Sequence, residues 1–340
     1  MEPHEIELPR KVLLGHGVIR QLPSVCKEFC ASGSALVLSD RTTMKVAGEA
    51  VAGAIGCEIG IINGPEYDEA EKLKEEHPDI GLIVSVGGGK TIDTGKFLAF
   101  DKGIPLISAP TAPSHDGIAS ERVSITRNGR KYSARAKPPV AIVADVDILL
   151  KAPYRLIASG CADVVSNFVS VYDWKLGKEQ GEYYSKYAAT LALLSAEMVK
   201  NSAMAIRKLE ERGIRDLLEA IITSGISMSL AQSSRPASGS EHMFSHAMEG
   251  LGSTALHGQQ CGLGSIAMAC LQGQDWKGIR DTLSVIGSAT TARELGVDDD
   301  MVVSALVNAK RIRDRHTILN IKPLDENRAR ELCEKTGIFT

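Results

Sequence analysis

The chain has 340 residues, a formal net charge of −3, 44% hydrophobic and 24% charged residues. These values are ordinary for a globular protein and exclude the basic surface that nucleic acids require. No apolar run is long enough to span a membrane, and the acidic amino-terminal residues lack the features of a signal peptide. Seven cysteines without a CxxC pair indicate reduced thiols. We therefore expect a cytoplasmic protein with no nucleic-acid partner and no membrane span.

The first 150 residues alternate short apolar runs with segments of helical length, such as Glu66–Glu76. This alternation is typical of βαβ units and predicts a Rossmann-like parallel sheet. In addition, the Asn128-Gly129 pair between Arg122–Thr126 and Tyr132–Ala136 predicts an inserted β-hairpin. The predicted strands of the sheet are Ala35–Ser39, Glu58–Ile62, Gly81–Val86, Pro105–Ala109 and Val140–Ala144.

The second half lacks clear strands and carries apolar residues at helical spacing over Tyr183–Leu209, Ile214–Ala231 and Gln260–Leu271. The sequence therefore predicts an α/β domain over residues 1–152, followed by an all-α helical-bundle domain over residues 153–340. We expect the active site in the cleft between these two domains, where ligands commonly bind.

A glycine-rich turn, Ser85-Val86-Gly87-Gly88-Gly89-Lys90-Thr91-Ile92-Asp93, follows an apolar strand and precedes a predicted helix. Glycines let the backbone approach a phosphate, and the helix N-terminus offers N–H donors. The turn matches neither the P-loop pattern nor the G-x-G-x-x-G fingerprint, so a tight turn without a ligand stays an alternative.

Asp40 ends the first predicted strand and is a candidate for binding the ribose of a dinucleotide. Its alternative role is to cap the helix that follows. Arg41 beside it could accommodate a 2′-phosphate, so both NAD and NADP stay open as cofactors.

Three of the eight histidines fall within sixteen residues. His242 and His246 are four apart on a predicted helix and share one face, and His257 follows after two glycines. Imidazoles with one carboxylate make a catalytic zinc site, for which Asp163 is the candidate carboxylate. The alternatives are ordinary surface or core histidines, and an aspartate in the first turn of a helix.

The loop Pro110-Thr111-Ala112-Pro113-Ser114-His115-Asp116-Gly117-Ile118-Ala119-Ser120 leaves the carboxyl end of a predicted strand. Open α/β sheets bind their ligands at such ends, so this hydroxyl-rich loop with Asp116 is a candidate binding segment. The alternative is a polar connection.

In this order, Gly-Gly-Gly-Lys-x-x-Asp, Pro-Thr-x-x-Ser, Gly-x-Ala-Asp, His-x-x-x-His and a later histidine resemble one superfamily. Its members are iron- or zinc-dependent alcohol dehydrogenases, glycerol dehydrogenases and dehydroquinate synthases. The resemblance covers nearly the whole chain. Two stretches, starting at Pro110 and at Tyr132, most resemble the archaeal glycerol-1-phosphate dehydrogenases.

The resemblance implies roles for individual residues. It implies one zinc ion per subunit bound by Asp163, His242 and His257, in preference to iron or nickel, although two histidines and an aspartate suit either zinc or iron. It places His246, Asp116 and Asp163 at the substrate as catalytic residues. The implied NAD(P)H site has Gly88, Gly89, Lys90, Thr91 and Asp93 at the pyrophosphate, with Thr111, Ser114 and Ser120 nearer the nicotinamide.

The implied activity is the reduction of dihydroxyacetone phosphate to sn-glycerol 1-phosphate for archaeal membrane lipids, by a homo-oligomer. The substrate phosphate requires cationic partners, for which Lys137 and Arg235 are candidates. The alternative activities are those of a glycerol dehydrogenase acting on an unphosphorylated substrate and of a lyase like dehydroquinate synthase. A cofactor-binding protein without turnover would need no metal site.

Overall fold

The computed structural model of the protein describes residues 6–31 and 33–339. The chain divides into two compact units, Met1–Pro153 and Tyr154–Thr340. Within the described residues, no helix combines the length and the apolar character that a membrane crossing requires.

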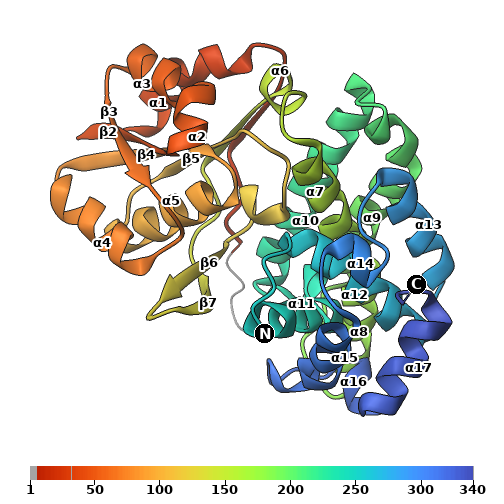
Figure 1. The fold of residues 1–340 in the computed structure, drawn as a ribbon. Coiled ribbons are helices and arrows are strands. Elements are labelled where there is room, and N and C mark those ends of the chain that lie inside the picture. The colour runs from red at the N-terminus through yellow and green to blue at the C-terminus, as the bar shows by residue number, and fades with distance from the viewer. Residues whose placement is uncertain (1–5, 32, 340) are drawn as a thin grey trace. The chain divides into compact units, whose positions relative to one another are not determined.

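The first unit contains a parallel six-stranded sheet in the order β1-β8-β5-β4-β2-β3 (Figure 1). All five predicted strands are present and shift by one or two residues at most. The sixth strand, β1, was not predicted from the sequence. The strands are β1 (Lys11–Gly15), β2 (Ser34–Asp40), β3 (Glu58–Ile62), β4 (Ile80–Gly87), β5 (Leu106–Pro110) and β8 (Ala141–Asp145).

Helices cover both faces of this sheet. Successive side chains of a strand point to opposite faces, so one strand contributes to the cores on both sides. In β2, Val37 joins a core with α1 (Leu22–Phe29) and α3 (Glu49–Ile55). Its neighbours Leu36 and Leu38 join the other core, which contains side chains from α4 (Tyr67–Glu76) and α5 (Gly89–Lys102). The buried strands explain why their sequences are continuous apolar runs.

The carboxyl ends of three neighbouring strands bring the predicted cofactor segments to one edge of the sheet. Asp40 ends β2, Gly87 ends β4, and Pro110 ends β5. Strands β4 and β5 pair up to Gly87 and Pro110, and the Thr111 N–H donates to the Gly87 carbonyl at 3.0 Å. The glycine-rich turn and the hydroxyl-rich loop are therefore neighbours.

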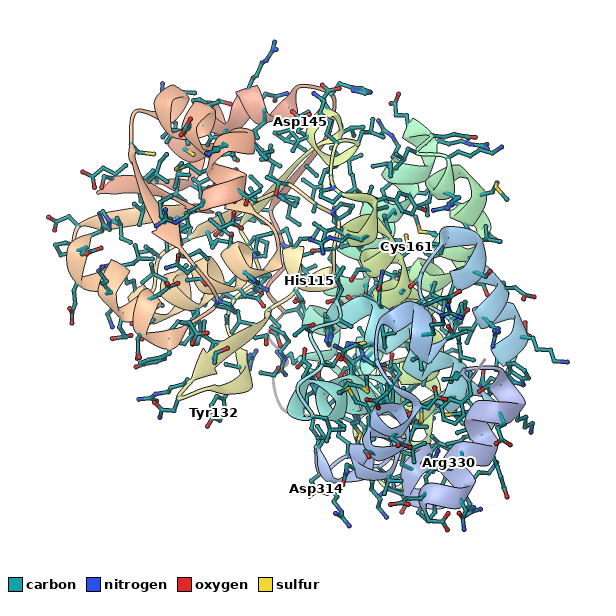
Figure 2. All side chains as sticks on the ribbon, viewed as in Figure 1. His115, Tyr132, Asp145, Cys161, Asp314 and Arg330 are labelled. Atoms are coloured by element: carbon teal, nitrogen blue, oxygen red, sulfur yellow. The ribbon has the colours of Figure 1, made fainter. Side chains whose placement is uncertain are left out.

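The predicted hairpin is present as β6 (Arg122–Arg127) paired with β7 (Arg130–Arg135). Asn128 and Gly129 have φ values of 53° and 71°, as a two-residue type I′ turn requires. Tyr132 of β7 is half-exposed on this hairpin (Figure 2).

In the described part of the second unit, the regular elements are all helices (Figure 1). The long helices α9 and α10 pack along each other, and α12 packs against α7, α11 and α13. The longer helices are α7 (Tyr154–Val165), α8 (Asn167–Glu179), α9 (Lys186–Arg207), α10 (Glu211–Ala231), α11 (Ser240–Gly250), α12 (His257–Gln272), α13 (Trp276–Ile286), α15 (Asp299–Asn308) and α17 (Glu326–Thr336). Two helices of one turn complete the unit, α14 (Ala292–Leu295) and α16 (Ile318–Ile321).

A parallel Rossmann-like sheet followed by a helical unit confirms the predicted fold class. The three predicted long helices correspond to α9, α10 and α12. The inserted hairpin is likewise confirmed.

Candidate active site

Helices α7 and α12 approach each other closely because α12 has glycines where it faces α7. A Cβ atom added to Gly258 would lie 2.0 Å from the carbonyl oxygen of Ser159, and one on Gly262 would lie 2.9 Å from the Cβ of Ala162. Glycine is thus required where α12 contacts α7. This contact places His257, the first residue of α12, beside Asp163 on α7.

Helix α11 is positioned by a buried carboxylate. Asp173 on α8 is fully buried and accepts hydrogen bonds from the Ser240 N–H at 2.7 Å, the Ile318 N–H at 2.8 Å and the Gln272 side chain at 3.1 Å. It therefore fixes the first turn of α11, which carries His242. Burial raises the pKa of Asp173 to about 6.

Glu241, also fully buried, orients the imidazole of His242. Its Oε1 lies 2.8 Å from His242 Nδ1 and accepts the Gly239 N–H at 2.7 Å. This contact directs His242 Nε2 toward Asp163, which is the arrangement that carboxylates give to metal-binding histidines. Burial raises the pKa of Glu241 to about 7.

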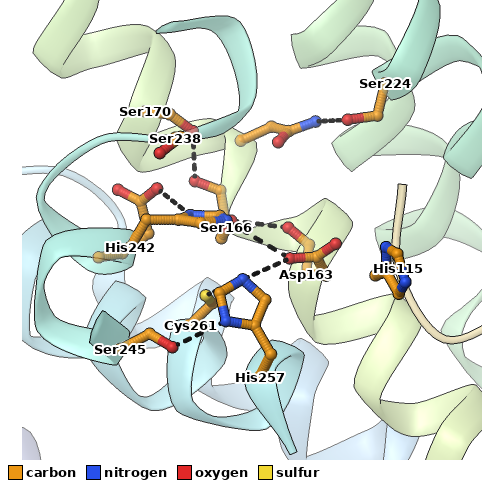
Figure 3. Close-up of polar contacts among 12 residues, drawn as sticks. His115, Asp163, Ser166, Ser170, Ser224, Ser238, His242, Ser245, His257 and Cys261 are labelled. Carbon is orange, nitrogen blue, oxygen red and sulfur yellow. Dashed lines mark hydrogen bonds and ion pairs between the residues drawn. The ribbon is translucent and has the colours of Figure 1, made fainter. Parts of the chain in front are cut away.

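Two imidazole nitrogens converge on the same carboxylate oxygen (Figure 3). His242 Nε2 lies 3.6 Å from Asp163 Oδ1, and His257 Nε2 lies 4.0 Å from that oxygen. The Nδ1 atom of His257 contacts Ser245 Oγ at 3.0 Å and Glu249 at 3.7 Å. Like Nδ1 of His242, it therefore faces away from Asp163. Cys261, one turn after His257 on α12, adds its Sγ atom, and all four candidate donor atoms lie within 4.8 Å of one another.

These distances fit a single divalent cation. Nitrogen and oxygen ligands bound tetrahedrally to one zinc ion at about 2.0–2.2 Å lie roughly 3.4 Å apart. The observed separations of 3.6 Å and 4.0 Å are close to that value. Two imidazoles, a carboxylate and a thiol are also a donor set that zinc and iron accept.

The protonation of the cluster depends on its neighbours. Burial and the nearby His257 lower the pKa of His242 well below its ordinary value. Burial alone would also lower the pKa of His257, but Cys261, Glu249 and Asp163 outweigh it and raise that pKa well above its ordinary value. The raised pKa favours a protonated His257 imidazole. A bound cation requires the neutral imidazole and would displace that proton.

Asp163 lies in the last turn of α7, not in the first turn of a helix, so the alternative reading from the sequence was wrong. Small and apolar residues fill the two turns before Asp163, and only Val164 and Val165 follow it in the helix. A carboxylate at this end of a helix faces the negative end of the dipole. The helix dipole therefore does not explain the position of Asp163, whereas its contacts with His242 and His257 do.

His246 faces the same cluster from α11 without belonging to the four-donor group. Its ring centroid lies 5.6 Å from that of His257. Its Nδ1 contacts Glu249 Oε2 at 3.3 Å, and its Nε2 accepts a hydrogen bond from Arg313 at 3.1 Å. Burial lowers the pKa of His246; Glu249 opposes this effect, and the charge of Arg313 adds to it.

In the first unit, Gly88 and Gly89 form the start of α5 and have different surroundings. A Cβ atom added to Gly88 would meet no atom within 4 Å, whereas one on Gly89 would lie 1.8 Å from His115 Nε2. His115 Nδ1 accepts the Gly117 N–H at 2.8 Å, which holds its ring over the turn. Only Gly88 therefore leaves open space at this helix N-terminus.

The loop after β5 is held by a buried lysine. Lys96 on α5 is 1% exposed, and its Nζ atom donates to the carbonyls of Gly117 at 2.7 Å and Ser120 at 3.3 Å. Asp93, one turn earlier, contacts Lys96 at 3.2 Å and accepts the Ser124 N–H at 3.0 Å. Asp93 and Ser120 thus have structural roles in this unit, and their direct contact with a cofactor stays a prediction.

The other predicted cofactor residues occupy varied positions along this edge. Asp40 Oδ1 accepts the N–H groups of Thr42 and Thr43, both at 2.8 Å, so the helix cap predicted as its alternative role is present. Thr91 is fully buried against Gly87, and Lys90 beside it is exposed. Thr111 is buried, whereas Ser114 and Asp116 are half-buried on the loop.

Several residues that contact the site were missed by the sequence analysis. Cys261 could have been found, because it lies four residues after His257 on one helix. Glu241 could also have been found beside His242. His115 and Arg313 have no local signal of this kind, since their contacts depend on tertiary packing.

The comparisons with known proteins agree with this geometry. The sequence profile of the iron-containing alcohol dehydrogenases matches residues 13–153. Among solved structures, the fold is similar to glycerol dehydrogenase from Schizosaccharomyces pombe, with a TM-score of 0.81 and 19% identity over 100% of this chain and 94% of that one. A probable glycerol dehydrogenase from Sinorhizobium meliloti has a TM-score of 0.80 and 20% identity over 99% and 100% of the two chains. The fold is thus similar to that of the glycerol dehydrogenases.

Similar curated proteins identify the family to which the chain belongs. Glycerol-1-phosphate dehydrogenase [NAD(P)+] from Thermococcus kodakarensis is 44% identical over 99% of both chains. The Methanothermobacter thermautotrophicus protein of the same name is 42% identical over 100% of both chains. The chain therefore belongs to the glycerol-1-phosphate dehydrogenase family and is an oxidoreductase.

Proposed function

We propose that the protein reduces dihydroxyacetone phosphate to sn-glycerol 1-phosphate with NADH or NADPH and one zinc ion per subunit. The convergence of His242 Nε2 and His257 Nε2 on Asp163 Oδ1 carries this proposal, because a cation held there could polarise the carbonyl oxygen of the substrate. The names of the full-length relatives support the substrate and the cofactor.

Asp163, His242 and His257 would hold the ion. When bound, zinc supplies the positive charge that polarises a ketone and stabilises an alkoxide. Glu241 and Ser245 fix the two imidazoles through their Nδ1 atoms, so the ligands keep their orientation when the substrate enters.

His246 would supply the proton that completes the reduction, directly or through an ordered water. It lies beside the cluster, with its Nδ1 on Glu249 and its Nε2 accepting from Arg313, so Arg313 would have to release Nε2 before that atom could carry a proton to the substrate. Asp116 would bind a substrate hydroxyl. In total, hydride from the nicotinamide and one proton convert the C2 ketone to a secondary alcohol and release NAD(P)+.

The first unit would bind the dinucleotide at the carboxyl edge of its sheet, and the second would bind the metal and the substrate. The open space at Gly88, next to the N-terminus of α5, suits a pyrophosphate. Asp40 can cap α2 (Arg41–Thr43) through Oδ1 and still offer Oδ2 to a ribose hydroxyl. Lys90, Thr91, Asp93, Thr111, Ser114 and Ser120 stay as proposed contacts of the cofactor.

Oxidation of NADH and NADPH by purified protein tests the proposal, with dihydroxyacetone phosphate beside dihydroxyacetone, before and after chelation. We expect oxidation that requires the substrate phosphate, is lost on chelation and returns when zinc is restored. Equal rates with both ketones would favour a glycerol dehydrogenase. No oxidation with either ketone, in protein that contains metal, would favour the lyase.

Three further expectations belong to this proposal. The active site in a cleft between the two units, the homo-oligomer and the cytoplasmic location stay predictions. Light scattering of the purified protein tests the oligomer, and cell fractionation tests the location.

A further inference from the structure

The segment after α15 carries two arginines that both bind Ser238. Arg313 Nη1 donates to Ser238 Oγ at 3.4 Å, and Arg315 Nη1 donates to the Ser238 carbonyl at 2.8 Å. Arg315 Nη2 also donates to Ser234 Oγ at 2.7 Å. Ser238 directly precedes the N-cap of α11, so the two guanidinium groups lie next to the helix that carries His242 and His246.

Arg313 also reaches the proposed proton donor. Its Nη2 atom lies 3.1 Å from His246 Nε2, and both side chains are half-buried. Asp314, between the two arginines in sequence, is exposed at the surface (Figure 2). The Ser238 hydroxyl and the His246 imidazole are among the acceptors of Arg313, and a phosphate dianion is a stronger acceptor than either.

The cations suggested by the sequence are occupied elsewhere. Arg235 is 4% exposed, forms a two-point contact with Glu182, and donates to the His316 carbonyl at 3.0 Å. Lys137 in the first unit pairs with Glu7 at 2.7 Å. A buried arginine already matched to a carboxylate is a poor partner for an incoming phosphate, because binding would break that pair.

We propose that Arg313, supported by Arg315 and Ser238, binds the phosphate group of the substrate. In dihydroxyacetone phosphate, the phosphate-bearing carbon is attached directly to the ketone carbon. The group that binds the phosphate must therefore lie beside the group that protonates the ketone oxygen, as Arg313 lies beside His246. This inference rests on the proposed function and assigns its substrate specificity to one side chain.

A planar guanidinium suits this role. It can present two N–H groups to two phosphate oxygens, which a lysine cannot reproduce. Both Arg313→Gln and Arg313→Lys should therefore be impaired, with the lysine variant intermediate.

The test compares kcat/KM for dihydroxyacetone phosphate and dihydroxyacetone in the zinc-loaded wild type and the Arg313→Gln variant. We expect KM for the phosphorylated ketone to rise roughly 100-fold, as the loss of a charged hydrogen-bond donor produces. The preference for the phosphorylated over the unphosphorylated ketone should fall at least about 30-fold. Arg311→Gln is the matched control, because Arg311 is exposed on the same segment and contacts Asn308.

Equal losses with both ketones, or a KM within a few-fold of the wild type, would overturn the inference. The ratio of activities with NADPH and NADH separates a second source of phosphate, since a change in that ratio would assign Arg313 to the cofactor instead. Metal content and Tm of the variant show whether it is folded and loaded.

Calorimetric binding of inorganic phosphate separates this inference from the proposed function. If the wild type does not turn over dihydroxyacetone phosphate, the proposed function fails. Arg313 is then still supported as a phosphate ligand if phosphate binds to the wild type and not to Arg313→Gln, and is excluded if both bind equally.

Discussion

At the scale of single residues, Asp163 has the position that is hardest to explain without a ligand. It is buried in the last turn of α7 and faces two imidazole nitrogens that are anchored from behind by Glu241 and Ser245. Buried charges are paired or bind metals. Both neighbours of Asp163 are histidines, which can pair with a carboxylate and are the commonest metal ligands. The candidate metal centre is therefore built from side chains that already hold their orientation.

Replacing a ligand should separate the metal from the rest of the fold. We expect His242→Ala to lose stoichiometric zinc and its activity, while NADH still binds, because the proposed nucleotide-binding edge lies in the first unit. Metal analysis and NADH fluorescence titration measure the two effects. Full activity with stoichiometric metal in this variant would remove His242 from the ligand set.

Cys261 should behave differently, because a catalytic zinc site keeps one position open for the substrate and a fourth protein ligand would close it. We expect Cys261→Ala to retain stoichiometric metal. The cobalt-substituted wild type should lack an intense thiolate-to-cobalt band in the near ultraviolet. A strong band that disappears in Cys261→Ala would show thiolate ligation and a site of structural type.

Gly88 and Gly89 provide a matched pair of substitutions. Gly88→Ala should change the free energy of unfolding by no more than about 0.5 kcal/mol, because the new methyl group meets no atom within 4 Å and φ is −86°. It should still weaken NADH binding about tenfold or more, because the methyl group would occupy the space proposed for the pyrophosphate.

Gly89→Ala should instead lower stability by about 1–3 kcal/mol, because its methyl group would overlap His115. Thermal unfolding and NADH titration of both variants distinguish the two effects. Unchanged NADH affinity in Gly88→Ala would exclude the proposed pyrophosphate position.

At the scale of elements, the start of α11 depends on two buried carboxylates. Asp173 fixes the first turn, and Glu241 orients His242 within it. Burial raises the pKa of both above the values of the unfolded chain, to about 6 and about 7. The same burial that orders the site therefore makes its folding dependent on pH.

The sign of this dependence follows from proton uptake. Between about pH 4.5 and pH 7 the folded state holds more protons on these carboxyls than the unfolded state, so their contribution to stability falls as pH rises. In chelated protein, we expect unfolding by urea to show a loss of stability of several kcal/mol across this window. Glu241→Gln should reduce the loss, and an equal loss in that variant would assign it to other groups.

The elements show which parts of the fold can be predicted from sequence. Strands β2, β4, β5 and β8 were predicted because each is largely buried and reads as a continuous apolar run, whereas the half-exposed edge strand β3 was predicted from its three isoleucines. Strand β1, the other edge strand, was missed because its apolar run is only three residues long, Val12–Leu14. The position of Asp163 in α7 was misjudged because small and apolar residues continue through both turns before it and do not mark where the helix begins.

At the scale of the whole molecule, local spacing predicted one part of the site and tertiary packing determined the other. His242 and His257 are close in sequence and lie beside Asp163, with His246 next to them. Arg313 contacts His246 across 67 residues, so no local pattern could reveal it. Likewise, the glycines that allow α12 to approach α7 can be recognised as necessary only when the position of the facing helix is known.

The most direct test of net ketone reduction follows deuterium from the cofactor. Dihydroxyacetone phosphate is incubated with the zinc-loaded protein and NADH deuterated at either the 4R or the 4S position. The account predicts glycerol phosphate that carries one deuterium at C2 with one of the two cofactors and none with the other. Glycerol phosphate without deuterium from both cofactors, or no glycerol phosphate and no oxidised cofactor, would contradict it.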